Sequence, residues 1–158
     1  REGVDKNKIF FVGNVMIDTL LKHKEKASKS KILEKLNLKK DNYCALTLHR
    51  PSNVDAKENF DNILYILDKI QQKMKIVFPV HPRTRKNAKL FNLENKMSSM
   101  KNLILTEPLG YLDFLWLMAN SRLVLTDSGG IQEETTVLGV PCITLRKNTP
   151  FFTGRLYY

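Results

Sequence analysis

The sequence has few cysteines and histidines and no long apolar run. Two cysteines, Cys44 and Cys142, each lie within a short apolar stretch, which favours buried thiols over a disulfide or a metal-binding pair. The three histidines are scattered without metal-ligand spacing, and nothing in the sequence indicates a cofactor. No run approaches the ~18 apolar residues of a membrane span, and the charged start REGVDKNK lacks the pattern of a signal peptide. We therefore expect a cytoplasmic protein with neither a metal site nor a membrane partner.

Acidic residues are also scarce relative to basic ones. The 26 lysines and arginines outnumber the 16 acidic residues and give a formal net charge of +10. The excess is spread over the first two thirds of the chain, lysines outnumber arginines 19 to 7, and no basic stripe is interleaved with aromatic residues. This distribution does not favour a nucleic-acid partner. A cationic surface would instead raise the encounter rate with an anionic small molecule.

Six short apolar runs alternate with amphipathic segments. The expected strands are residues 9–12, 43–48, 76–80, 103–105, 123–126 and 142–145. The expected helices are residues 15–22, 31–36, 53–72, 84–90, 112–120 and 131–138. Most strand runs are continuously apolar, as in strands covered on both faces. The pattern predicts one Rossmann-like α/β domain, a parallel sheet with helices on both faces.

Polar residues follow most of the expected strands. In a doubly wound sheet, ligands bind where the carboxyl ends of the strands lead into helices. These loops carry His49 and Arg50, His81, Ser128 with its two glycines, and Arg146. We expect them to meet at one edge of the sheet and to bind a phosphorylated small ligand.

The Ser128-Gly129-Gly130 turn precedes an expected helix. The first N–H groups of a helix lack internal partners, and glycine lets a phosphate approach the bare backbone. A plain turn with Ser128 as the helix cap explains the same residues, so both interpretations stay open. The sequence matches neither the G-x-G-x-x-G fingerprint nor a P-loop. Glu133 and Glu134 complement the helix dipole, or one of them accepts hydrogen bonds from a ribose diol.

Three further candidates also have structural explanations. His49 can hydrogen-bond or protonate a phosphate oxygen, or bond to the local backbone. His81 lies between two prolines and is more ambiguous. Phe114 lies in an apolar helix, where it serves either the core or a stacked base.

Four segments in order carry a family resemblance: LTLHRPSNVD, FPVHPRTRK, LTEPLGYLDFLWLMANSRLVLTDSGGIQEE and LGVPCITLRKNT. Together they resemble the non-hydrolysing UDP-N-acetylglucosamine 2-epimerase family, and the resemblance runs from about residue 11 to residue 149. The chain is similar to the C-terminal, nucleotide-binding half of that family only.

The resemblance implies the second of two Rossmann-like domains in a glycosyltransferase-B-like architecture. Residues 1–149 would form this UDP-binding domain, with residues 150–158 as a divergent tail of a truncated chain. The family interconverts UDP-GlcNAc and UDP-ManNAc, for cell-envelope polysaccharides, by eliminating UDP to a 2-acetamidoglucal and adding it back. Its catalytic carboxylates lie in the first domain, and nothing here replaces them. The chain would therefore bind UDP but be inactive alone.

The family's binding residues carry over onto matching positions. Ser128, Gly129 and Gly130 would hold the diphosphate of UDP. Glu134 would hold the ribose hydroxyls, and Phe114 would border the uracil.

The catalytic and regulatory residues carry over in the same way. His49 would assist departure of UDP, and Arg146 would face the sugar-phosphate region. Arg50 and His81 resemble positions that line an allosteric UDP-GlcNAc site. Ser52 stands where many members have an acidic residue, which weakens the match of this loop.

The expected partners are UDP or UDP-GlcNAc, the missing N-terminal domain, and a second copy in a homodimer. Other readings of the sequence are a stand-alone nucleotide-sugar binding module, half of a UDP-sugar glycosyltransferase, or a non-functional fragment.

Overall fold

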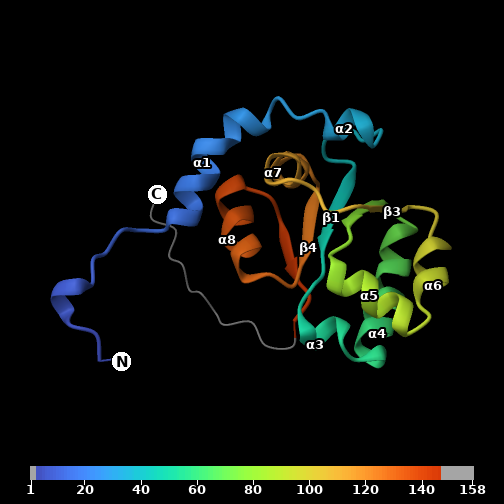
Figure 1. The fold of residues 1–158 in the computed structure, drawn as a ribbon. Coiled ribbons are helices and arrows are strands. Elements are labelled where there is room, and N and C mark those ends of the chain that lie inside the picture. Colours follow the sequence, from blue (N-terminus) through green and yellow to red (C-terminus); the bar gives the residue numbers. More distant parts are fainter. Residues whose placement is uncertain (1–2, 147–158) are drawn as a thin grey trace.

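A five-stranded parallel sheet forms the centre of the computed structural model, which describes residues 3–146 (Figure 1). The strands are β1 (Tyr43–Thr47), β2 (Lys75–Pro79), β3 (Leu103–Thr106), β4 (Leu123–Thr126) and β5 (Cys142–Thr144). Their order is β3-β2-β1-β4-β5, and every pairing is parallel. The predicted fold class is confirmed. The predicted tail at residues 150–158 lies outside the described residues.

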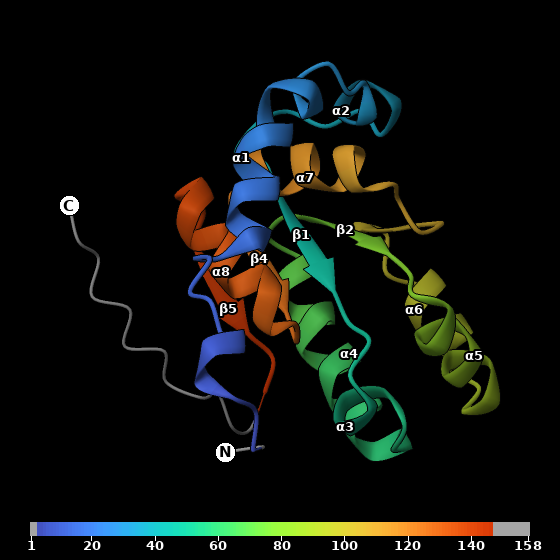
Figure 2. The same ribbon diagram turned by 60° about the vertical axis from the view of Figure 1, so that its left-hand side comes forward.

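Helices cover both faces of the sheet (Figures 1 and 2). One face carries α3 (Pro51–Val54), α4 (Lys57–Gln71), α5 (Pro82–Leu90) and α6 (Glu94–Ser98). The other carries α1 (Val15–Ala27), α2 (Ile32–Lys35), α7 (Tyr111–Ala119) and α8 (Gly129–Leu138). A short 3-10 helix, η1 (Lys6–Lys8), precedes them.

The two layers produce two apolar cores on opposite sides of β1. Cys44 and Leu46 join the core with Phe60 of α4, whereas Tyr43 joins the core with Leu117 of α7. Because both faces are covered, residues 43–46 are buried one after another instead of alternating between buried and exposed. The buried Tyr43 hydroxyl donates to the carbonyl of Leu117 at 2.6 Å, which satisfies its polar end.

The residues at the ends of α3, α5 and α8 explain where these helices begin or end. Pro51 and Pro82 stand at the first positions of α3 and α5, where a missing N–H costs nothing. His81 caps α5, its Nδ1 accepting from the N–H of Arg83 at 3.2 Å. Gly139 ends α8 in the left-handed conformation, φ +70°.

The expected strand at residues 9–12 is wrong. None of the five strands pairs with it, and its side chains lie largely in the open, with Phe11 98% exposed. Figures 1 and 2 show this stretch running outside the sheet, ahead of α1. An apolar run resembles a strand in the sequence, but a strand also needs a neighbour to take its backbone hydrogen bonds.

Two helix boundaries also differ from expectation. The segment expected as one helix over residues 53–72 is split into α3 and α4, with Asp55 and Ala56 between them. Asp55 instead accepts two hydrogen bonds from the Arg83 guanidinium, at 2.8 and 2.6 Å. This ion pair joins the start of α4 to α5. The pattern of the sequence does not predict α6, which the structure adds.

Candidate functional site

A crevice at the switch point of the sheet brings the predicted residues together. Strands β1 and β4 are neighbours, but the chain leaves β1 towards α3 and α4 and leaves β4 towards α8, on the opposite face. In open α/β sheets the loops diverge at such a point and leave a ligand crevice. The two loops that meet there are residues 48–50 and residues 127–128.

Asp127 connects these two loops. Its carboxylate is fully buried and accepts hydrogen bonds from the backbone N–H groups of His49 and Arg50, at 3.0 and 2.8 Å. The amide of Asn53 donates to it at 3.2 Å and also to the carbonyl of Leu145 at 2.8 Å. The β1, β4 and β5 ends are therefore fixed relative to one another by one side chain and its donors.

His49 lies at the mouth of this network. Its Nδ1 is 3.1 Å from an Asp127 oxygen, and its side chain is 41% exposed. The ring of His81 lies beside it, with 5.6 Å between ring centroids. Both predicted histidines are thus at one place, although His81 also has the capping role given above.

The Ser128 turn is positioned by threonines beneath it. Thr126 Oγ1 accepts from the Ser128 N–H at 3.0 Å and is paired with Thr47 Oγ1 at 2.7 Å. Ser128 is the N-cap of α8, yet its hydroxyl makes no capping bond. Its hydroxyl and the first N–H groups of the helix are consequently available to a ligand.

The two glycines of the turn face different neighbours. A Cβ added at Gly129 would lie 3.4 Å from Nη2 of Arg146. A Cβ added at Gly130 would lie 2.6 Å from the terminal methyl of Met16, which belongs to α1. Gly129 therefore borders the arginine, whereas Gly130 is covered by α1.

Arg146 leaves one donor unused. Its Nε donates to the backbone carbonyl of Asp127 at 2.8 Å, but Nη2 is buried and has no hydrogen-bond partner among residues 3–146. Burial lowers the pKa of Arg146 and repulsion from Arg50 lowers it further, while the charge of Asp127 raises it. A desolvated donor beside a second cation has the chemistry that an anion would satisfy.

Glu134 is a second group at the crevice that could take a ligand's hydrogen bonds. It is 7% exposed, and its carboxylate accepts no hydrogen bond from any residue within 3–146. Burial raises the pKa of Glu134. The pKa of Tyr111 is also raised, mainly by burial of the phenol and secondly by the charge of Glu134. Glu133, in contrast, accepts from the amide of Asn14 at 2.7 Å. Of the two glutamates, Glu134 is the largely buried one, and no described side chain donates to it.

Phe114 is half-buried and packs against the core on the α7 and α8 side of the sheet. The contact of Phe114 with the uracil stays a prediction.

Sequence reasoning missed two residues of the crevice. Asp127 and Asn53 were not assigned any role, yet they organise both loops. The available signal was an acidic residue directly after the buried strand β4, where an unpaired carboxylate would be costly. Such a residue requires several donors, and the His49 loop supplies them.

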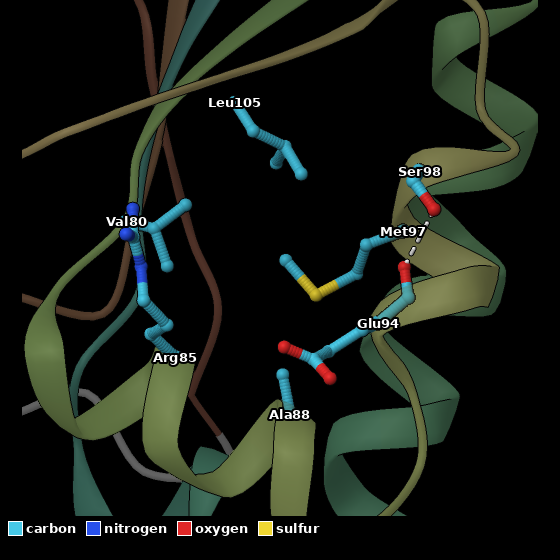
Figure 3. Close-up of a pocket in the computed structure, with 7 residues that line it drawn as sticks. All are labelled: Val80, Arg85, Ala88, Glu94, Met97, Ser98 and Leu105. Atoms are coloured by element: carbon cyan, nitrogen blue, oxygen red, sulfur yellow. Dashed lines mark hydrogen bonds between the residues drawn. The ribbon is translucent and has the colours of Figure 1, made fainter.

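A separate cavity of about 270 Å³ lies between α5 and α6, beside the ends of β2 and β3. In Figure 3, Ala88 of α5 faces Glu94 and Met97 of α6, Arg85 runs up beside Val80, and Leu105 lies above them. Its lining is mainly apolar. It contributes no residue to the crevice.

Two absences concern the described part of the chain. Within residues 3–146, no three His, Cys, Asp or Glu side chains are grouped so that they could hold a metal ion. None of the helices there combines the length and hydropathy that crossing a bilayer requires.

The strand order and the crevice define an α/β domain of the Rossmann type, with a helix N-terminus and unsatisfied cationic donors at its switch point. A family model described as UDP-N-acetylglucosamine 2-epimerase matches residues 1–157. The chain belongs to the UDP-N-acetylglucosamine 2-epimerase family.

Individual relatives agree with this assignment. The chain is 47% identical to the UDP-N-acetylglucosamine 2-epimerase of Methanocaldococcus jannaschii, over 94% of this chain and 42% of that protein. It is 36% identical to the UDP-2,3-diacetamido-2,3-dideoxy-D-glucuronate 2-epimerase of Pseudomonas aeruginosa, over 90% of this chain and 38% of that protein. The chain thus spans about two fifths of the length of the relatives that it matches.

Solved structures are also similar. The Methanocaldococcus jannaschii epimerase in complex with UDP-GlcNAc and UDP gives a TM-score of 0.82, with 94% of this chain and 42% of that chain covered. The Neisseria meningitidis epimerase bound to UDP-GlcNAc is 32% identical and gives a TM-score of 0.71, with 94% and 41% covered.

Proposed function

We propose that the chain is the UDP-binding part of a UDP-N-acetylglucosamine 2-epimerase and does not epimerise its substrate by itself. The observation that carries this proposal is the buried, unpartnered Nη2 of Arg146 beside Gly129, at the start of α8. The family match adds that relatives with this sequence pattern act on UDP-sugars.

The diphosphate is proposed to bind at Ser128 and Gly129. The free Ser128 hydroxyl, the first N–H groups of α8 and Arg146 Nη2 all offer donors there. The positive end of the helix dipole adds to this attraction. Binding an anion would also relieve the repulsion between Arg146 and Arg50. Met16 occupies the space beside Gly130, so Ser128 and Gly129 are the more accessible part of the turn.

The nucleoside would extend along α8 towards α7. Glu134 is proposed to accept hydrogen bonds from the ribose hydroxyls, because it is buried and has unused acceptor capacity. Phe114 of α7 is proposed to border the uracil.

The chemistry assigned to this chain is departure of UDP. As the bond between the sugar C1 and the diphosphate oxygen breaks, negative charge develops on the diphosphate. Preorganised donors at Ser128, Gly129 and Arg146 would stabilise this charge. A protonated His49 would give its Nε2 proton to a phosphate oxygen.

Inversion at C2 needs a group that removes a proton and another that returns it on the opposite face. The resemblance places such carboxylates in the first domain of the family. We therefore propose that the rest of an epimerase must complete the site. The names of the relatives share UDP but differ in the sugar, so the proposal for this chain concerns UDP first.

Calorimetric titration of the chain with UDP tests the proposal. We expect binding by the chain, and Arg146→Ala is expected to weaken it by roughly 10- to 100-fold, because a hydrogen bond to a charged group is worth about 1.5–3 kcal/mol. Arg122→Ala is the matched control, because it removes the same charge from an exposed side chain at the other end of β4. Uridine, which lacks phosphates, should bind much more weakly than UDP.

The proposal would be contradicted if the folded chain gave no heat of binding with UDP. It would also be contradicted if Arg146→Ala and Arg122→Ala lost equal affinity for UDP. In a parallel assay, the chain alone with UDP-GlcNAc should give no UDP-ManNAc by NMR. Formation of UDP-ManNAc would overturn the statement that the chain is inactive by itself.

Arg50 and His81 are proposed to contact a second nucleotide-sugar beside the first. His81 supports this because its ring borders His49 and retains an exposed position. A two-site isotherm with UDP-GlcNAc that becomes one-site in His81→Ala would fit the proposal, whereas a one-site isotherm for the unmodified chain would exclude it.

A further inference from the structure

The two oxygens of the Asp127 carboxylate have different partners. Oδ2 accepts from the backbone N–H groups of His49 and Arg50 at 3.0 and 2.8 Å and from the Asn53 amide at 3.2 Å. Oδ1 faces the His49 ring at Nδ1, 3.1 Å away, and receives a longer contact from the His49 N–H at 3.2 Å. The carboxylate is surrounded by donors and lies fully out of solvent. This environment suits an ionised carboxylate, which only accepts.

We propose that Asp127 is the positioning residue for His49, a role that rests on the proposed function. An ionised carboxylate 3.1 Å from Nδ1 favours a proton on Nδ1, so Nε2 is the ring nitrogen left for a ligand. The backbone bonds to the same carboxylate fix the loop from which the ring projects. The fixed ring then presents Nε2 to a diphosphate bound at the neighbouring Ser128 turn. His49 is the proposed proton donor for UDP departure, and the carboxylate fixes the direction in which its Nε2 points.

His81 provides an internal contrast. Its Nδ1 accepts the N–H of Arg83 at 3.2 Å, so Nδ1 of His81 must be unprotonated in the neutral ring. Nδ1 of the third histidine, His23, lies 2.8 Å from the carbonyl of Thr19 and therefore carries a proton. The neighbouring rings of His49 and His81 should consequently be opposite tautomers.

A long-range ¹H–¹⁵N correlation spectrum of the chain, labelled with ¹⁵N-histidine, tests this directly at a pH where the rings are neutral. We expect the Nδ1–H tautomer at His49 and His23 and the Nε2–H tautomer at His81. Spectra of His49→Gln and His81→Gln assign the signals. A predominant Nε2–H tautomer at His49 in the unmodified chain would overturn the proposal, whatever the behaviour of any variant.

Asp127→Asn supplies the second measurement. The amide oxygen is expected to take the Oδ2 position, where three donors converge, which leaves the amide NH₂ opposite His49 Nδ1. An NH₂ there donates to Nδ1 and should move His49 from mainly Nδ1–H to mainly Nε2–H. Asp55→Asn is the matched control, because it changes a carboxylate that contacts Arg83 and Asn87 but not His49. A tautomer that is unchanged in folded Asp127→Asn, or equally changed in Asp55→Asn, would contradict the proposal.

The tautomer and UDP binding are separate readouts. The expected tautomers in a chain that fails to bind UDP would leave Asp127 as the positioning residue and remove the proposed function. UDP binding by a chain with the opposite tautomer at His49 would do the reverse. Where both hold, Asp127→Asn should weaken UDP binding by about tenfold, because Nε2 of His49 is no longer the nitrogen presented to the diphosphate in the same protonation state and orientation.

Discussion

At the scale of single residues, the crevice contains charged groups that are satisfied to different degrees. The Asp127 carboxylate accepts from three hydrogen-bond donors in the His49 loop and α3 and lies 3.1 Å from Nδ1 of His49, so its burial is compensated. Arg146 uses Nε but leaves Nη2 buried and unpaired among residues 3–146. A buried charge with enough partners stabilises the fold without a ligand. A buried donor without a partner is stabilised when a ligand supplies an acceptor. We therefore expect a ligand in this crevice to contact Arg146.

Glu134→Gln should separate stability from binding. Burial raises the folded-state pKa of Glu134, so ionisation of this carboxyl opposes folding at any pH above its ordinary value of 4.5. Glutamine removes that charge, and we expect the variant to be at least as stable as the original chain at neutral pH. UDP binding should fall by roughly tenfold or more, because the ribose hydroxyls lose a charged acceptor. Urea unfolding and calorimetry measure the two effects.

Glu133→Gln is the control for this change. Glu133 already accepts from Asn14, so its substitution should leave UDP affinity nearly unchanged. The ligand gives a second control, since 2′-deoxy-UDP should bind more weakly than UDP to the original chain but nearly as well as UDP to Glu134→Gln. A parallel loss in both glutamate variants would remove Glu134 from the ribose site.

At the scale of secondary structure, the chain ahead of α1 behaves unlike the rest of the described residues. Asn14 caps α1 by accepting from the N–H groups of Met16 and Ile17, and its amide holds Glu133 of α8. The apolar residues of the preceding segment, 9–12, remain largely exposed. The helix is therefore anchored at its start, while the segment before it contributes little buried apolar area.

Phe11→Ala and Phe60→Ala test this difference with the same chemical change. Phe11 is almost fully exposed, so its loss should alter the free energy of unfolding by less than about 0.5 kcal/mol. Phe60 is fully buried in α4, and its loss should cost about 3–5 kcal/mol. Urea unfolding at matched conditions gives both values. A cost above about 1.5 kcal/mol for Phe11→Ala would mean that this segment packs against the domain.

The sequence predicted a strand correctly where an apolar run also has a neighbouring strand in the fold. The run at residues 43–48 became the central strand β1, because two neighbouring strands and two helical layers cover it. The run at residues 9–12 has the same pattern but no strand beside it, and pattern alone cannot supply a neighbour. Loop positions of His49, Ser128 and Arg146 followed from the rule for parallel sheets. The role of Asp127 could not follow, because it depends on donors that lie 74 to 78 residues away in sequence.

At the scale of the whole molecule, the parallel sheet and its two helical layers place the crevice at a single edge. The same topology buries a tyrosine and a cysteine at the centre of the domain, on opposite faces of β1, where neither can ionise without cost. Burial raises the pKa of the Cys44 thiol from 9.0 to about 12, and burial followed by the charge of Asp41 raises the pKa of the Tyr43 phenol above its ordinary value of 10.0. These shifts make global stability depend on alkaline pH.

The direction of that dependence follows from proton binding. Above pH 9 the thiol of the unfolded chain loses its proton while the folded chain keeps it, and the phenol does the same above pH 10. The unfolded state then binds fewer protons, so the free energy of unfolding decreases as pH rises. The contribution is complete below pH 9 and is lost progressively towards about pH 12. Urea unfolding at a series of pH values between about 8 and 11 should show a falling midpoint with an unchanged slope.

Tyr43→Phe identifies the source of this loss. The variant lacks the buried phenol and its bond to Leu117, so it should start about 1 kcal/mol less stable but lose less stability between pH 10 and 11. Tyr65→Phe is the matched control, because Tyr65 is exposed on α4 and should retain the full alkaline loss. Identical pH profiles for the two variants would show that alkaline sensitivity has another origin, such as titration of the many lysines that give the chain its positive charge. A flatter profile for Tyr43→Phe alone would locate it at the centre of the sheet, where folding separates the Tyr43 phenol from water.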